Sequence, residues 1–175
     1  MLKKTIVSMA LCGSILAAGM GIASATIAKD EVQLGGISPF GMNRGSVSRI
    51  YGNPTREEYG GAVWHYGNSV KISFQEGSLS SVTVTANNGW TTPAGLAVGM
   101  EADEAIALYG DPDESADQGS KRLYVYYINA YERGRGHLGV VFDKDSQTIT
   151  KLNVYKSKMA DYREYYPGWK KNMLS

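Results

Sequence analysis

The chain has 175 residues, and its 18 lysines and arginines nearly balance its 17 aspartates and glutamates. This length suffices for one ordinary domain or for two small ones that share a core. The near-neutral charge gives no electrostatic basis for binding nucleic acid or anionic lipid, so neither is expected as a partner.

The N-terminus has the pattern of a signal peptide over residues 1–25. Lys3 and Lys4 precede an apolar run over 5–21, and a small-residue cleavage site ends at Ala25. We expect cleavage after Ala25, a periplasmic or extracellular location, and no transmembrane segment in the mature chain. The single cysteine, Cys12, lies inside the apolar run, so lipidation is not expected and the mature chain has no thiol.

Two stretches of the mature chain resemble each other. Residues 40–52 contain Phe-Gly-Met followed by Tyr-Gly, and residues 98–110 contain Val-Gly-Met followed by Tyr-Gly, 58 residues later. The apolar pattern that follows also recurs, with insertions between the predicted strands. The sequence therefore predicts repeat 1 over 26–86, a linker over 87–95, repeat 2 over 96–156, and an aromatic and basic C-terminal tail over 157–175.

Each repeat is predicted to hold one helix and three strands. Asn43 can cap the first helix, and Gly52 and Gly110 end the two helices. Apolar and polar residues alternate in the strands, which indicates one buried and one solvent-facing side of an antiparallel sheet. The predicted fold class is α+β, with two tandem helix-plus-antiparallel-sheet repeats packed side by side. The predicted helices cover 43–51 and 102–109, and the predicted strands cover 62–67, 69–75, 79–86, 122–130, 137–142 and 148–156.

The repeated Gly-Met and Tyr-Gly motifs resemble those of the β-lactamase inhibitor protein family and, more broadly, of the SmpA/OmlA small envelope lipoproteins. The resemblance covers nearly the whole mature chain as architecture, although its specific residues are few. It implies a helical element packed on an antiparallel sheet in each repeat. In the inhibitor proteins the concave sheet surface grips another protein, so the resemblance also implies a protein-binding face. The cysteine pairs of the inhibitor repeats are not present in this chain.

Motifs for catalysis or for metal and cofactor binding are not recognisable in the sequence. The two histidines, His65 and His137, are not part of an H-E-x-x-H motif, and no serine lies in a G-x-S-x-G setting. We therefore expect no catalytic residue, no metal and no cofactor.

The solvent-facing side of the predicted sheet is the expected binding surface. Period-two geometry turns one set of side chains outward, and the second half is rich in tyrosine, which suits recognition surfaces. The expected binding residues are His65, Lys71, Thr83, Tyr127, Val141, Lys151 and Tyr155. The predicted function is an exported, non-enzymatic protein-binding module of the cell envelope. The alternatives are an envelope assembly or scaffold factor, and an inhibitor of a secreted hydrolase such as a β-lactamase or a peptidase.

Overall fold

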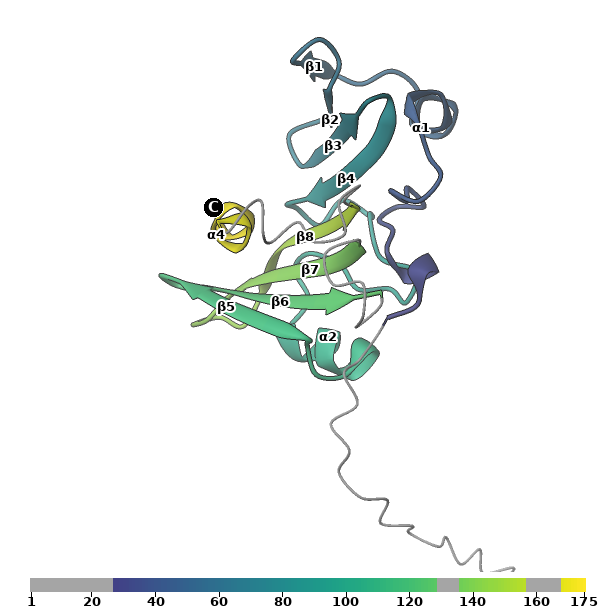
Figure 1. Ribbon diagram of the computed structural model, residues 1–175. Helices are drawn as coiled ribbons and strands as arrows, with labels where there is room; N and C mark the ends of the chain where they lie inside the picture. Colours follow the sequence, from purple (N-terminus) through teal and green to yellow (C-terminus); the bar gives the residue numbers. More distant parts are fainter. Residues whose placement is uncertain (1–26, 129–135, 157–167) are drawn as a thin grey trace, which may run out of the picture.

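A computed structural model of the protein describes residues 27–128, 136–156 and 168–175 (Figure 1). The predicted signal peptide and its cleavage site after Ala25 lie outside the described residues. So do the end of the strand predicted over 122–130 and most of the predicted tail. Among the described residues, no helix has the length and apolar character needed to cross a membrane.

The described chain forms one antiparallel sheet of eight strands with short helices around it (Figure 1). Their order across the sheet, starting from one edge, is β1 (Arg56–Glu58), β2 (Val63–Tyr66), β3 (Val70–Gln75), β4 (Ser78–Val84), β8 (Ile149–Lys156), β7 (Gly136–Asp143), β6 (Lys121–Tyr127) and β5 (Glu114–Gln118). The helical segments are η1 (Lys29–Glu31), α1 (Arg44–Tyr51), α2 (Ala102–Tyr109) and α4 (Trp169–Leu174).

The predicted fold class of two helix-plus-sheet repeats packed side by side is wrong. Strands β4 and β8 pair directly, with Val82 opposite Val154 and Thr83 opposite Asn153. Backbone hydrogen bonds therefore run across the middle of the molecule, and the strands of both halves belong to a single sheet. The alternation of apolar and polar residues could locate the strands, but it could not predict that β4 pairs with β8, which lies about 70 residues later in the chain.

Local sequence sets the ends of α1 and α2. The side chain of Asn43 accepts a hydrogen bond from the backbone N–H of Ser46 at 3.0 Å, which satisfies one of the free donors of the first turn of α1. Gly52 and Gly110 follow the two helices with φ of 74° and 77°, a left-handed region that favours glycine.

The main core lies on one face of the sheet, beneath α1, α2 and the N-terminal segment. The alternating side chains of β3, Val70, Ile72 and Phe74, are buried there, and the ring of Trp64 meets that of Phe74 at 4.9 Å between centroids. The same cluster continues through the second half of the chain with Leu138, Val140, Phe142, Leu152 and Val154. One continuous core therefore supports both halves.

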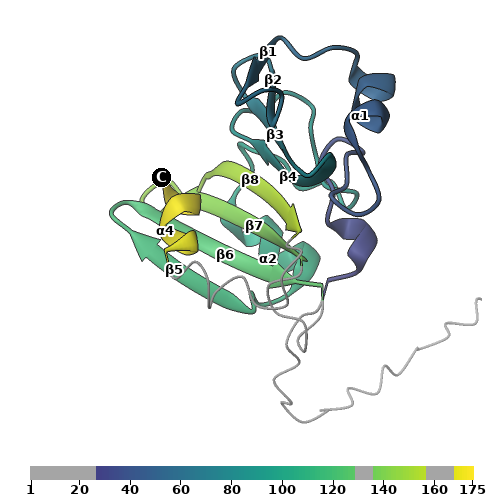
Figure 2. The ribbon, with the colours of Figure 1, turned by 45° about the horizontal axis from the view of Figure 1, so that its top comes forward.

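The other face of the sheet is covered in part by α4, which lies across the strands of the second half on the side opposite α2 (Figure 2). Its Leu174 is buried against a second apolar cluster made of Leu123, Val125, Tyr127 and Val141. The expectation that this face is open to solvent is therefore wrong over β6 and β7. Strand β7 is buried on both sides from Gly136 to Phe142.

Candidate functional site

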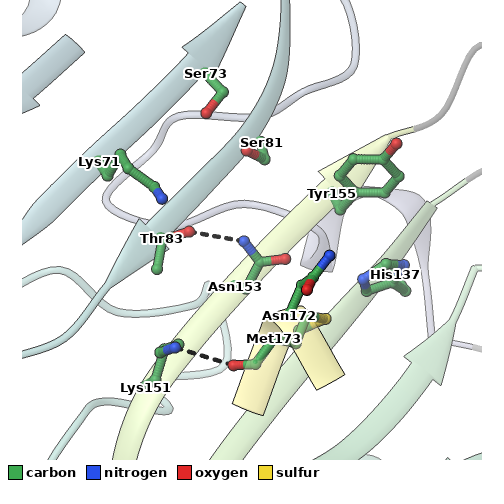
Figure 3. Close-up of a pocket in the computed structure, with 10 residues that line it drawn as sticks. All are labelled: Lys71, Ser73, Ser81, Thr83, His137, Lys151, Asn153, Tyr155, Asn172 and Met173. Atoms are coloured by element: carbon green, nitrogen blue, oxygen red, sulfur yellow. Dashed lines mark hydrogen bonds between the residues drawn. The ribbon is translucent and has the colours of Figure 1, made fainter. Parts of the chain in front are cut away.

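A polar hollow of about 300 Å³ lies on the face of the sheet that carries α4 (Figure 3). Strands β3, β4, β7 and β8 form its floor, and α4 contributes one wall. Side chains with hydroxyl, amide, ammonium and aromatic groups line it: Lys71, Ser73, Ser81, Thr83, His137, Lys151, Asn153, Tyr155, Asn172 and Met173.

Strand register arranges the floor in rows that run across the sheet. In one row, Ser73 pairs with Ser81, Ser81 with Tyr155, and Tyr155 with His137. In the next row, Lys71 pairs with Thr83, and Thr83 with Asn153. Side chains on one face alternate with those of the core face, so these polar groups face away from the main core. The register that buries Ile72 and Val82 thus also assembles the hollow.

Hydrogen bonds fix part of the floor and leave other groups available. The amide nitrogen of Asn153 donates to Thr83 Oγ1 at 2.8 Å (Figure 3) and to the Val82 carbonyl at 3.2 Å. The hydroxyls of Ser73 and Ser81 make no hydrogen bond to any group in the described part of the chain, and both residues are half-buried. The floor therefore offers hydroxyl donors whose backbone is held rigidly by the sheet.

Three lysines gather where α4 ends. Lys151 Nζ donates to the Met173 carbonyl at 2.9 Å, and Lys121 Nζ donates to the Leu174 carbonyl at 3.0 Å. The last carbonyls of a helix lack partners within it and favour a nearby positive charge. Partial burial lowers the pKa of Lys151, and the charges of Lys121 and Lys71 lower it further.

The aromatic end of the hollow is formed by Tyr155 and His137. The His137 ring lies 5.3 Å from that of Tyr155 and 6.1 Å from that of Tyr127, between ring centroids. Burial lowers the pKa of His137 to about 4, against an opposing effect of the Glu114 charge. At neutral pH this imidazole is uncharged, so the positive charge of the lining belongs to its lysines.

A second hollow of about 370 Å³ adjoins the polar hollow and shares Lys71, Thr83, Lys151 and Asn172 with it. It extends the polar surface toward β1 and β2, where its lining includes Arg56 and His65. Glu58 lies close to both, 3.1 Å from Arg56 Nη2 and 3.4 Å from His65 Nε2. At the outer end of the second hollow, the carboxylate of Glu58 therefore lies beside the positive charge of Arg56.

The structure brings together four of the seven expected binding residues. Lys71, Thr83, Lys151 and Tyr155 line the polar hollow, and His65 lines the second hollow. The other two expected residues are buried and line neither: Tyr127 is 1% exposed and Val141 is 0% exposed, because α4 packs over them.

Sequence reasoning left six residues of the polar hollow out of the expected binding set: Ser73, Ser81, His137, Asn153, Asn172 and Met173. Ser73, Ser81 and Asn153 share the outward register of Lys71 and Thr83, so the alternation pattern contained the signal for them. Asn172 comes from α4, whose position on the sheet no local pattern indicated. In the described residues, no group of three or more histidines, cysteines, aspartates or glutamates is placed to hold a metal ion.

Comparisons with known proteins give little beyond the structure itself. No protein-family model matches the chain, and no curated protein is similar to it in sequence. A crystal structure of an extracellular protein containing a SCP domain from Bacillus anthracis str. Ames is similar with a TM-score of 0.47 and 10% identity. The match covers 83% of this chain and 50% of that one, so the chain spans about half the length of that protein. At this level of similarity no property is carried over from it.

Proposed function

We propose that the protein is an exported, non-enzymatic binding module of the cell envelope that recognises a protein partner through the polar hollow. The observation that carries the proposal is the rigid, half-open floor of the hollow. Its hydroxyl groups and lysines face solvent from a sheet whose other side is a continuous core. A concave site with convergent polar groups is the usual form of a recognition site.

The chemistry of the lining favours binding over catalysis. An activated nucleophile needs a base within hydrogen-bond reach. In the described part of the chain, the hydroxyls of Ser73 and Ser81 bond to no histidine and to no carboxylate. The pattern of residues 1–25 supports export, since a basic start, an apolar run and a small-residue site together direct secretion.

Site-specific photo-crosslinking in the cells that produce the protein tests this function. A photoreactive residue at Ser81, in the hollow, is expected to give a covalent adduct with a partner protein. The same residue at Ile50, which is 51% exposed on α1, serves as the control and is expected to give none. Adducts from position 50 alone, or from neither position, would contradict recognition through the hollow. N-terminal sequencing of the secreted form tests cleavage after Ala25.

A further inference from the structure

We propose that the polar hollow binds the carboxylate side chains of an acidic segment in the partner protein, and that Lys71 is the residue that pairs with them. The inference rests on the proposed function and names the chemistry of the partner. It follows from the charges of the lining, from the hydrogen bonds already made there, and from the backbone beneath it.

The hollow holds positive charge without a counter-charge. Lys71 and Lys151 both line it, Lys121 lies near enough to act on Lys151, and no aspartate or glutamate is among the described residues that line it. Neither Lys71 nor Lys151 forms an ion pair with any described residue. Three like charges at a partly buried site repel one another, and a bound anion relieves that repulsion.

Lys71 is the lysine available to an incoming group. The ammonium groups of Lys151 and Lys121 already donate to the carbonyls at the end of α4. Lys71 is exposed on β3, directly opposite Thr83, and donates no hydrogen bond to the described chain. Its ammonium can therefore turn toward a ligand without breaking a contact of the fold.

The neighbouring groups complete a site for carboxylate oxygens. An ionised carboxylate only accepts hydrogen bonds, and its two oxygens offer about four acceptor positions. The hydroxyls of Ser73, Ser81 and Thr83 and the side-chain amide of Asn172 are donors in the same lining. A carboxylate that entered beside Lys71 would meet both a charge and neutral donors, which together make strong hydrogen bonds.

The backbone of the hollow favours carboxylate over phosphate. Phosphate sites commonly use an arginine fork or a nest of free backbone N–H groups. The floor here is built from β3, β4, β7 and β8, whose facing N–H groups are used in strand pairing. The arginine of the second hollow, Arg56, already lies beside Glu58. An acidic segment whose carboxylates enter the polar hollow beside Lys71 fits this arrangement best.

Binding of a labelled hexaglutamate peptide to the full-length protein tests the inference, with hexaglutamine and inorganic phosphate as comparison ligands. We expect hexaglutamate to bind, hexaglutamine not to bind, and the affinity to fall as salt is raised. Lys71→Gln is expected to weaken binding about tenfold, the usual loss for one charged hydrogen bond. Lys144→Gln is the matched control, because it removes the same charge from a lysine that lines neither hollow. It is expected to change the affinity less than about twofold.

Three results would overturn the inference: equal binding of hexaglutamine, equal weakening by Lys71→Gln and Lys144→Gln, or Lys71-dependent binding of phosphate tighter than that of hexaglutamate. Failure of the proposed function is distinguishable from these. A partner adduct at position 81 without Lys71-dependent hexaglutamate binding refutes only the acidic segment. Lys71-dependent hexaglutamate binding without any adduct refutes the protein partner and leaves the carboxylate site.

Discussion

Burial changes the acid–base chemistry of His137. Its side chain lies in the interior, in contact with the rings of Tyr127 and Tyr155. Burial disfavours the imidazolium form and lowers the pKa of His137 to about 4, although the charge of Glu114 acts in the opposite direction. The folded protein therefore keeps this ring neutral in a pH range where an unfolded chain would protonate it.

This difference predicts a loss of stability in acid. Below about pH 6.5 the unfolded chain gains a proton at His137, while the folded chain gains it only near pH 4. The free energy of unfolding is therefore unaffected by protonation of His137 above pH 6.5, and it decreases as the pH falls from 6.5 toward 4. The total decrease in the free energy of unfolding over this range is about 3 kcal/mol. Urea unfolding at a series of pH values measures it, and His137→Phe is expected to flatten the curve in this window.

The other histidine provides the control for this pH series. His65→Gln leaves His137 in place and is expected to retain the loss of stability between pH 6.5 and 4. If the wild type and His137→Phe lost the same free energy of unfolding over this range, the buried neutral histidine would not be the cause.

Among the elements, α4 decides how much of the second sheet face is open. Leu174 anchors it in the apolar cluster over β6 and β7, the side chain of Lys170 pairs with Glu114 on β5, and its last carbonyls meet Lys121 and Lys151. The side chain of Met173 fills the space above Gly139 of β7, where a β-carbon would collide with it.

Gly139→Ala is therefore expected to push the flexible end of the Met173 side chain aside and loosen α4 slightly, at a cost below about 1 kcal/mol in the free energy of unfolding. Hydrogen exchange of the Asn172 and Ser175 amides, which close the turns of α4, is expected to become faster. Adding Met173→Ala removes the obstructing side chain and should restore slow exchange. Fast exchange that persisted in the double variant would show that Gly139 acts through another contact.

Most strands and the first two helices could be predicted from local patterns. In β3 the alternation of Val70, Ile72 and Phe74 with polar residues gave both the strand and its buried face. The edge strands β1 and β5 were missed, since their sequences are short, charged and without apolar alternation. The helix α4 was missed because it is six residues long and depends on the sheet beneath it.

The candidate site was predicted in part for the same reason. Register alone placed Lys71 and Thr83 on the outer face. The error at Val141 and Tyr127 arose from treating β7 as a strand with one wet side. Residues 138–142 read Leu-Gly-Val-Val-Phe, an almost uninterrupted apolar run, and such runs are typical of strands covered on both faces. The sequence therefore indicated that β7 is buried on both faces, but it did not indicate that α4 covers the second face.

At the scale of the whole molecule, the pairing of β4 with β8 and the shared core make the two halves one folding unit. Val82 lies at this junction, fully buried opposite Val154. The three tryptophans are spread along the chain, with Trp64 on β2, Trp90 between the halves and Trp169 on α4. We therefore expect unfolding to be a single cooperative transition, in which tryptophan fluorescence and far-ultraviolet circular dichroism change together.

Val82→Ala tests directly whether the two halves unfold together. It is expected to lower the free energy of unfolding by about 2 kcal/mol and to shift both signals to the same lower urea midpoint. Tyr59→Ala, at a side chain that is 82% exposed, is the control and should change stability by less than about 0.5 kcal/mol. Two separate transitions would contradict a common folding unit.

Within the part of the chain that the structure describes, the sheet is open, and β1 and β5 are its two edge strands. Such edges can recruit strands from other molecules and start polymerisation. Here both are short and acidic: β1 contains Glu57 and Glu58, and β5 contains Glu114 and Asp117. Three of these acids are ion-paired, Glu58 with Arg56, Glu114 with Lys170, and Asp117 with Arg122 and Lys144, so an added strand would have to pack against charged side chains. Short, charged edges of this kind disfavour edge-to-edge pairing of copies.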